Sequence, residues 1–485
     1  MENLKEKTIT SFFWKLLERG GNQIVSLIVQ IIMARLLTPN DFGLLAILLV
    51  IVNIGNILSQ SGLGSALVQS SKVSKLDFST VFWISISTSS MLYLIVFFLA
   101  PFIATFYNAP VLEETLRVIA LIMPISAISS VLSAFSQRDL NFKKIFKATI
   151  SATFISGFIG VTAAIIGAGL WSLILQQLSY ALTNCIVLFL QTSWKPSLDF
   201  SKKIGLKHFR YGWKMFVPTL LETGYDSLSD LLVGRQFGTE KLGFLSQGKK
   251  YPVALDSIIG GSIQPVFFAA ISRSQNDINA VKNITQRTLK TAFYFVAPIM
   301  IFFALTAEPI VVLVLGEQWV PAVPFMQMYC FTSALSSFHS TNYQTYNGLG
   351  RSDLFLKTKM ITVAYGIVFL LIACFIVQDI YAVTIAYMIS SAISTIVYSF
   401  PNRKLIHYTY FQQIRDIALP IILAIFAAFI AYFITFINLP SILTIITQWL
   451  VATSIYLLLS KLFRVEEFNY LLNTLNELIS KLKAK

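Results

Sequence analysis

The chain has 485 residues, of which 55% are hydrophobic and only 12% are charged, and its mean hydropathy is +0.71. A soluble globular domain carries about 25% charged residues, so the composition excludes a soluble protein and predicts a polytopic membrane protein. The net charge of +14 does not indicate a nucleic-acid partner, because the basic residues are spread over short loops between apolar runs.

Apolar runs follow one another along most of the chain. A spanning helix needs about 20 mainly apolar residues. By this rule the sequence predicts an all-α fold with fourteen spans: 11–35, 43–68, 79–104, 113–136, 146–168, 170–192, 213–235, 242–270, 289–315, 322–347, 358–377, 380–401, 417–437 and 441–462. The basic start leads directly into the first span without a small-residue cleavage site, so no cleavable signal peptide is expected. The three cysteines lie in apolar segments without metal-ligand spacing, and we interpret them as packing residues.

The basic residues also predict the orientation of the chain. With the N-terminus in the cytoplasm, the most basic connections all fall on the inner side: Arg138 to Lys147, Lys195 to Arg210, Arg273 to Lys290 and Arg403 to Arg415. Such asymmetry over short loops follows the positive-inside rule. Both termini are therefore expected in the cytoplasm. His208 and His407 lie at these basic loops and are expected to be solvated.

Two stretches of the sequence repeat one another. Arg35 falls on Arg235 and Gly43 on Gly243, at a constant offset of 200 residues. Six predicted spans separate the two copies, so equivalent spans run in the same direction, as in a parallel repeat about an axis along the membrane normal. The predicted domains are a six-helix lobe, a cytoplasmic linker, a second six-helix lobe, two appended helices and an amphipathic cytoplasmic tail: 1–192, 193–212, 213–401, 402–462 and 463–485.

The first span of each lobe carries a polar stripe at helical spacing. The stripe is neutral in the first copy and acidic in the second: Asn22, Ser26 and Gln30 fall on Glu222, Asp226 and Asp230. Ionisable residues at membrane depth are costly and suggest function. Glu222, Asp226, Asp230 and the neighbouring Asp256 are therefore candidates for binding a coupling ion, H⁺ or Na⁺.

Cations lie in the equivalent spans. Arg19, Lys249 and Lys250 are candidates to contact an anionic substrate in a water-filled cavity. The alternative is that Asp230 pairs with Lys249 or Lys250 and the charges merely neutralise each other between packed helices.

Further polar residues at membrane depth complete the candidate set. The second span has a one-sided stripe of amides, and the tenth span has a lone histidine: Asn53, Asn56, Gln60 and His339. These groups either line the cavity or bond neighbouring helices. The serine-rich runs 126–136 and 333–340 are expected to allow close helix contacts.

Several motifs together resemble a known family. They are A-R-L-L-T-P-N-D-F-G at 34–43, Q-S-G-L-G-S-A-L-V-Q at 60–69, Q-R-D-L-N-F-K-K-I at 137–145, I-Q-P-V-F at 263–267 and N-G-L-G-R-S-D at 347–353. Their order along the chain is similar to that of the polysaccharide-repeat flippases of the multidrug/oligosaccharidyl-lipid/polysaccharide exporter superfamily, and most of all to the branch of colanic-acid and teichuronic-acid exporters.

The resemblance implies a fold and a function. The fold would be two six-helix lobes in a V, as in MATE transporters, with alternating access. The cargo would be an undecaprenyl-pyrophosphate-linked oligosaccharide moved from the inner to the outer leaflet of a bacterial cytoplasmic membrane. No cofactor is implied, and the partners would be the polymerase and glycosyltransferases of the same pathway, with the monomer as the functional unit. The acid-rich seventh span departs from the cationic cavity that the resemblance implies.

Other functions remain open at this point. A MATE-type drug antiporter would use the intramembrane acids for cationic drugs, and a lipid II flippase would share the architecture. An enzyme is not expected, because the sequence has no long loops, no carboxylate or histidine cluster outside the spans and no phosphate-binding glycine loop.

Overall fold

The computed structural model describes residues 21–469 apart from 24, 61, 71, 72, 140 and 438. Arg19 and most of the predicted cytoplasmic tail lie outside these residues. All regular structure in the described part is helical. The chain forms two compact units, Met1–Ser246 and Gln247–Lys485, called unit 1 and unit 2 below.

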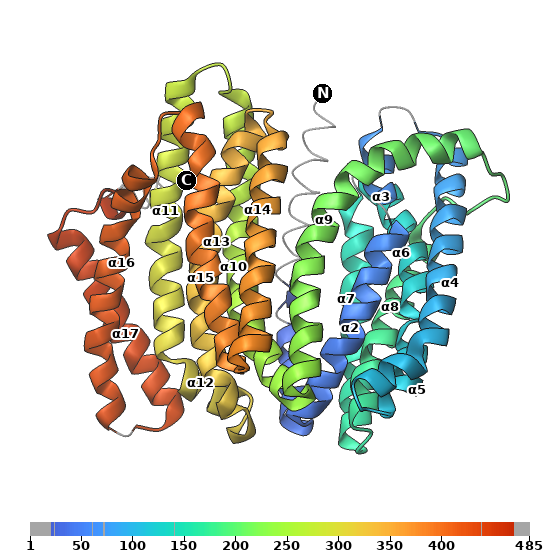
Figure 1. The fold of residues 1–485 in the computed structure, drawn as a ribbon, viewed down its shortest axis with the longest axis horizontal. Coiled ribbons are helices and arrows are strands. Elements are labelled where there is room, and N and C mark those ends of the chain that lie inside the picture. Colours follow the sequence, from blue (N-terminus) through green and yellow to red (C-terminus); the bar gives the residue numbers. More distant parts are fainter. Residues whose placement is uncertain are drawn as a thin grey trace, which may run out of the picture. The chain divides into compact units, whose positions relative to one another are not determined.

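Unit 1 is a bundle of long helices joined by short connections (Figure 1). A helix at Gly21–Leu36 precedes them. The others are α2 (Pro39–Gln60), α3 (Leu63–Gln69), α4 (Lys75–Phe106), α5 (Val111–Ile119), α6 (Ile122–Arg138), α7 (Phe142–Ile165), α8 (Leu170–Gln191), α9 (Lys202–Phe237) and the first turns of α10 (Thr239–Arg273).

Unit 2 contains the rest of α10 and a second bundle, with α16 and α17 at one edge (Figure 1). Its elements are α11 (Ile278–Leu305), α12 (Ala307–Val314), the 3₁₀ helix η1 (Glu317–Ala322), α13 (Val323–Gly348), α14 (Ser352–Leu371), the π-helix η2 (Ile372–Val377), α15 (Ile380–Leu405), α16 (Tyr410–Tyr432), the 3₁₀ helix η3 (Phe433–Ile437) and α17 (Ser441–Leu462).

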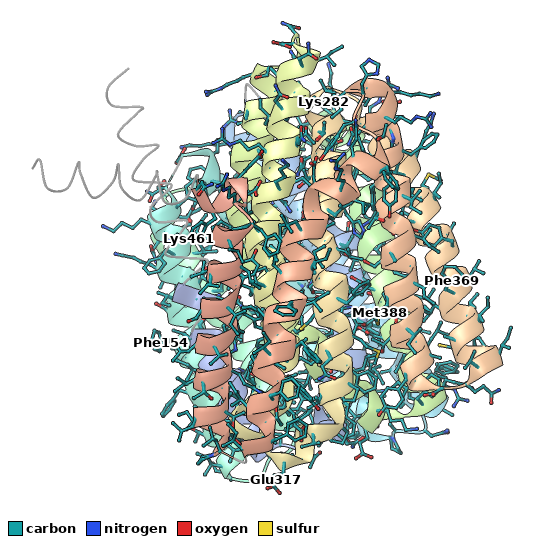
Figure 2. All side chains as sticks on the ribbon, turned by 90° about the vertical axis from the view of Figure 1, so that its left-hand side faces the viewer. Phe154, Lys282, Glu317, Phe369, Met388 and Lys461 are labelled. Carbon is teal, nitrogen blue, oxygen red and sulfur yellow. The ribbon has the colours of Figure 1, made fainter. Side chains whose placement is uncertain are left out.

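Ten of the described helical segments are long and apolar enough to cross a membrane, so the chain is a multi-pass membrane protein. Four predicted spans fall on the partly described N-terminal segment and on α9, α10 and α13, which are long but more polar. Fourteen crossings therefore stay a prediction. In unit 2, Lys282 and Glu317 lie at opposite ends of the bundle, with Phe369 and Met388 between them (Figure 2).

Local sequence signals explain where the helices begin. Thr38 and Asp41 bond reciprocally at the start of α2, where Asp41 Oδ2 accepts from the Thr38 amide at 3.0 Å and from its hydroxyl at 2.8 Å. Ser74 and Asp77 form a capping box at the start of α4. Gly62 has φ +68°, a conformation that glycine adopts at low cost, and it separates α2 from α3.

Each unit has its own apolar core. In unit 1, Trp194 is 3% exposed and packs with the rings of Phe78, Phe82 and Phe135. In unit 2, the alanine-rich face of α16 packs with α11 and α17. Small residues on this face allow helices to approach closely in lipid.

The two repeated stretches meet within unit 1. A Cβ added to Gly43 would lie 1.6 Å from the carbonyl oxygen of Thr239, and a Cβ added to Gly243 would lie 1.9 Å from that of Pro39. Both glycines lie within helices, α2 and α10, and not in the turn that precedes each helix. The two helices can therefore approach this closely only because neither residue has a Cβ atom.

Candidate functional site

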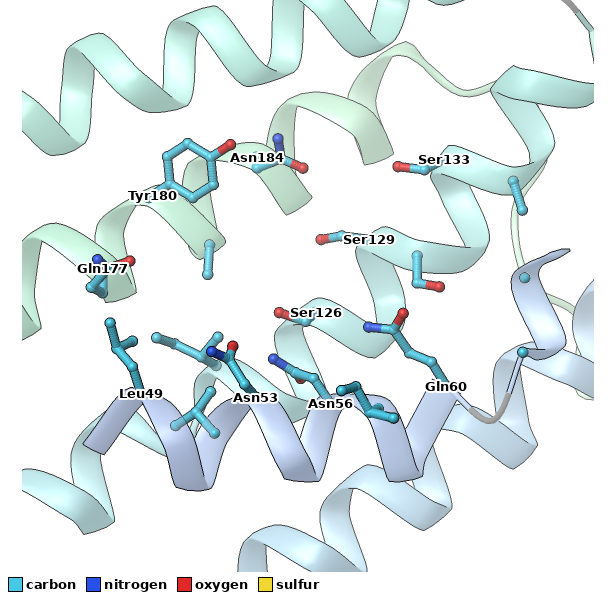
Figure 3. Close-up of a pocket in the computed structure, with 18 of the residues that line it drawn as sticks. Leu49, Asn53, Asn56, Gln60, Ser126, Ser129, Ser133, Gln177, Tyr180 and Asn184 are labelled. Atoms are coloured by element: carbon cyan, nitrogen blue, oxygen red, sulfur yellow. The ribbon is translucent and has the colours of Figure 1, made fainter. Parts of the chain in front are cut away.

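A large cavity lies within unit 1. Its volume is about 910 Å³, near the upper end of the range of about 300–1,000 Å³ for ligand sites. Helices α2, α6 and α8 form most of its wall (Figure 3). We call it the amide cavity, after the polar residues that line it: Asn53, Asn56, Gln60, Ser126, Ser129, Ser130, Ser133, Gln137, Gln177, Tyr180 and Asn184.

Helix α2 supplies the amides that the sequence pointed to. Asn53, Asn56 and Gln60 are spaced i, i+3 and i+7, so they share one face of the helix, and their side chains extend into the cavity (Figure 3). The Oδ1 atom of Asn56 has no hydrogen-bond partner among the described residues although it is buried. Buried polar atoms are nearly always bonded to protein or water, so this acceptor suits a donor from water or from a ligand.

Helix α6 contributes a column of hydroxyls on the facing wall. Ser126, Ser129 and Ser133 point into the cavity (Figure 3). Ser129 Oγ donates to the carbonyl oxygen of Ile125 at 3.1 Å, which leaves lone pairs of its oxygen available to accept. The run 126–136 was expected to serve close helix contacts, yet part of it faces open space, because serine fits both environments.

Helix α8 adds residues that sequence reasoning missed. Gln177, Tyr180 and Asn184 are spaced i, i+3 and i+7 in a mainly apolar helix and all line the cavity. This is the same signal that identified the stripe on α2, and it was available in the sequence.

The described lining of the amide cavity has no charged residue. Its donors and acceptors are amides and hydroxyls, with the ring of Tyr180 and several aliphatic side chains between them. Amides and hydroxyls both donate and accept. Such a lining is suited to a neutral ligand with many hydroxyl groups, and it offers no counter-charge to a cation or an anion.

The first polar stripe lies on the helix at Gly21–Leu36. Asn22 Oδ1 accepts a hydrogen bond from the hydroxyl of Thr153 in α7. Ser26 and Gln30 are half-buried on the same helix. Asn22 therefore has a bonding role between helices in this structure.

The predicted acids and lysines lie on α9 and α10. Asp226 and Asp230 are half-buried in unit 1, whereas the side chain of Glu222, like Arg19, lies outside the described residues. In unit 2, the ammonium of Lys249 lies 6.0 Å from the centroid of the Tyr329 ring, at the limit of a cation–π contact. Lys250 is half-buried beside it. Asp256 accepts a side-chain hydrogen bond from Ser336 of α13.

Two histidines occupy helix contacts. His339 Nε2 lies 3.1 Å from the carbonyl oxygen of Ser391 in α15 and beside the Tyr398 ring, so it bonds a neighbouring helix within unit 2. His208 was expected to be solvated, and this expectation is wrong. It is 1% exposed, and its Nε2 lies 2.8 Å from Asp77 Oδ1. His407 is exposed.

Within the described ranges, no group of three or more His, Cys, Asp or Glu side chains is placed to hold a metal ion. Cys330 and Cys374 are buried free thiols, and Cys185 is half-buried and free.

Several proteins with similar sequences are named for the biosynthesis of polysaccharides. The profile of a family described as polysaccharide biosynthesis protein matches residues 32–324. The chain is 23% identical, over 441 residues, to the lipopolysaccharide biosynthesis protein WzxC of Escherichia coli K12, covering 89% of this chain and 88% of that one. It is 24% identical, over 368 residues, to the succinoglycan biosynthesis transport protein ExoT of Rhizobium meliloti, covering 74% of each chain. It is 22% identical, over 318 residues, to the teichuronic acid biosynthesis protein TuaB of Bacillus subtilis, covering 64% of this chain and 65% of that one.

Solved structures show that the fold is shared. An inward closed structure of the lipid II flippase MurJ matches with a TM-score of 0.78 and 14% identity, covering 94% of this chain and 98% of that one. An inward-facing multidrug resistance transporter of the MATE family matches with a TM-score of 0.62 and 13% identity, covering 79% and 95%. At these identities the likeness establishes the fold alone.

Proposed function

The chain belongs to the polysaccharide biosynthesis protein family of the multidrug/oligosaccharidyl-lipid/polysaccharide superfamily, and from this premise we propose that it is a flippase for a lipid-linked oligosaccharide. The cargo is an undecaprenyl-pyrophosphate-linked repeat unit, moved from the inner to the outer leaflet of the bacterial cytoplasmic membrane by alternating access. The observation that carries the proposal is the uncharged, amide- and hydroxyl-lined cavity in unit 1 of a membrane-spanning fold.

The chemistry of the cargo explains why such a cavity is needed. Every sugar hydroxyl taken out of water without a new partner costs roughly 2–7 kcal/mol, so an oligosaccharide does not cross the hydrocarbon unaided. Amides and hydroxyls such as Asn56, Ser129 and Asn184 replace the hydrogen bonds to water. Neutral hydrogen bonds are individually weak, about 0.5–1.5 kcal/mol net, which also permits release. The lipid tail of the cargo remains in the bilayer throughout.

The proposed architecture is two parallel six-helix repeats with two appended helices. The reciprocal contact of Gly43 with residue 239 and of Gly243 with residue 39 supports it. Residues 200 positions apart contact each other's equivalents, as an approximate two-fold axis between the repeats requires. With the basic loops inside, both termini are cytoplasmic, and the glycines lie near the outer face.

Charged groups outside the amide cavity would serve the remainder of the cycle. Arg19, Lys249 and Lys250 are proposed to contact the pyrophosphate. Glu222, Asp226, Asp230 and Asp256 are proposed to bind the coupling ion, H⁺ or Na⁺, with no other cofactor. Asp256 is supported by its position in α10, a proposed span, and by its hydrogen bond from a neutral side chain, Ser336. The pathway's polymerase and glycosyltransferases are the proposed partners of a monomeric transporter.

The runner-up is a drug antiporter of the MATE type, and the lining of the cavity argues against it. A cationic drug is held by carboxylates or by aromatic faces, yet the described lining of the amide cavity contains no carboxylate and only two aromatic rings, those of Tyr180 and Phe216. Lipid II is the alternative cargo, since the fold matches that of the lipid II flippase MurJ.

Reconstitution tests the proposed activity directly. Proteoliposomes with the purified chain and a fluorescent undecaprenyl-pyrophosphate oligosaccharide are treated with a lectin or a membrane-impermeant quencher to measure exchange between leaflets. Exchange that depends on the protein supports the proposal. Exchange no faster than in empty liposomes, together with uptake of a cationic dye, would favour the antiporter.

A further inference from the structure

A second surface of unit 1, which shares no lining residue with the amide cavity, combines exposed cations with exposed apolar side chains. It consists of the connection after α8 and the first turns of α9. The exposed cations are Lys202, Lys203, Lys207 and Arg210, called the cationic strip below. The exposed fractions of the apolar side chains are 87% for Leu198, 55% for Phe200, 59% for Leu206 and 49% for Phe209.

This segment is held firmly against α4. His208 contacts Asp77 at 2.8 Å, and Gly205 faces Ile84 so closely that a Cβ would lie 2.7 Å from its Cδ1 atom. The Ser201 amide donates to Thr80 Oγ1 at 3.2 Å. These contacts hold one face of the first turns of α9 against α4, and the other faces of these turns point outward.

The outward faces have distinct chemistry. At the helical angle of 100° per residue, Lys203, Lys207 and Arg210 share one direction, and Leu206 and Phe209 share the direction next to it. Lys202, in the first turn, points in the same direction as Leu206 and Phe209. A helix with adjacent basic and apolar faces is typical of one that lies at the surface of a bilayer containing anionic lipids.

A groove lies beside the strip. It has a volume of about 480 Å³ between α4 and the connection, and it is lined by Trp83, Ile84, Ser87, Thr88, Leu198 and Phe200. We call it the Trp83 groove. Trp83 Nε1 donates to the carbonyl oxygen of Ser197 at 2.8 Å, which holds the connection against α4. Trp83 is eight residues from the start of α4, so it lies about 12 Å along the helix. Tryptophan is enriched where headgroups meet acyl chains.

We propose that this surface is a binding site for an anionic phospholipid of the bilayer, with the phosphate on the cationic strip and an acyl chain in the Trp83 groove. Charge complementarity selects the headgroup, since the segment 195–210 carries the four cations of the strip and Lys195 against one acid, Asp199. The apolar groove selects a lipid over a free phosphate. Because α9 continues from this site into the seventh predicted span, a bound lipid holds the start of that helix at the membrane surface.

The test measures lipid binding to the full chain in neutral detergent by native mass spectrometry. The probes are dioleoyl-phosphatidylglycerol and dioleoyl-phosphatidylcholine. Each cation near an anionic surface contributes about fivefold to affinity, so we expect phosphatidylglycerol to bind at least about tenfold more tightly. Replacement of the four cations of the strip by Gln should remove most of that preference.

Two further variants make the result specific. The matched control replaces four exposed cations of unit 2 by Gln: Arg273, Lys357, Arg403 and Lys404. It should keep the preference for phosphatidylglycerol. Ser87→Trp fills the Trp83 groove without changing charge, and it should weaken phosphatidylglycerol binding severalfold. If the four-Gln strip variant is not monodisperse on gel filtration, Ser87→Trp alone provides the test.

Three results would overturn the proposal. One is equal loss of phosphatidylglycerol binding in the strip variant and in the unit 2 control, which would reflect total charge only. Another is unchanged binding in both the strip variant and Ser87→Trp. The third is displacement of phosphatidylglycerol from the strip by an undecaprenyl-pyrophosphate lipid at equal concentration, which would assign the site to the cargo.

Discussion

Gly43 in α2 and Gly243 in α10 are in backbone contact, and each faces the residue four positions before the other. The missing Cβ atoms make this possible, because added methyl groups would lie 1.6 Å from the Thr239 oxygen and 1.9 Å from the Pro39 oxygen. Two residues that occupy equivalent positions in the repeated sequence thus form one helix–helix contact. This contact explains why glycine recurs at that position in both copies.

Alanine at either glycine should destabilise the protein. The clash is with backbone carbonyl groups, which cannot rotate away as a side chain does, so the cost should exceed the roughly 1–3 kcal/mol of ordinary overpacking. Gly43→Ala and Gly243→Ala should each lower the melting temperature in detergent clearly. Gly224→Ala is the matched control in a helix of the same unit, since nothing lies within 4 Å of its Cβ position. Equal melting temperatures for all three variants would show that the close contact at Gly43 and Gly243 does not contribute to stability.

The pair of His208 and Asp77 should contribute to the stability of unit 1. His208→Ala leaves a buried carboxylate with one partner fewer, which costs about 1–3 kcal/mol. Thermal unfolding of His208→Ala, Asp77→Asn and the double variant should show coupling between the two sites. His407→Asn changes an exposed histidine with φ +51°, a conformation that asparagine tolerates, and should be neutral. Additive effects of the single changes would show that the 2.8 Å contact adds nothing.

Loss of one cavity amide should slow transport without unfolding the protein. Asn56→Leu removes an amide donor and acceptor and replaces them with an apolar side chain of similar size. Loss of one neutral hydrogen bond should lower the transport rate about 3–10-fold. Leaflet exchange in proteoliposomes measures the effect, with the melting temperature as a check on folding. Gln275→Met, an amide in an exposed loop of unit 2, is the control. A wild-type rate for Asn56→Leu would exclude this amide from the path of the cargo.

Neutralising Asp256 tests ion coupling. If this carboxylate binds the coupling ion, Asp256→Asn should abolish the response of transport to an imposed pH or Na⁺ gradient, while downhill exchange continues. Asp353→Asn removes an exposed carboxylate that pairs with Arg351 at 2.9 Å, and it should leave the response intact because exposed pairs contribute little. An unchanged gradient response in Asp256→Asn would remove this residue from the set of coupling candidates.

Much of the fold follows from composition and hydropathy, because a span of apolar residues has few alternatives in lipid. The amides of α2 could be predicted for the same reason: Asn53 and Asn56 are conspicuous in an apolar helix. Gln177 and Asn184 carry an equal signal in α8. The serines of α6 were ambiguous, since the same hydroxyl serves a helix contact or a cavity wall.

Other features depend on contacts distant in sequence. His208 lies in a basic loop, where solvation is the ordinary expectation, and its partner Asp77 is 131 residues away. Local periodicity carries no information about such a pair. The Trp83 groove likewise forms only when the connection after α8 folds back onto α4.

The central claim is that this chain moves a lipid-linked oligosaccharide, and the most direct measurement is made in the native host. The gene is deleted, and the undecaprenyl-pyrophosphate-linked oligosaccharides are quantified in each leaflet. We predict accumulation in the cytoplasmic leaflet with loss of one surface polysaccharide, restored by the wild-type chain and only weakly by Asn56→Leu. An unchanged lipid pool in both leaflets, with increased sensitivity to cationic drugs, would contradict the account.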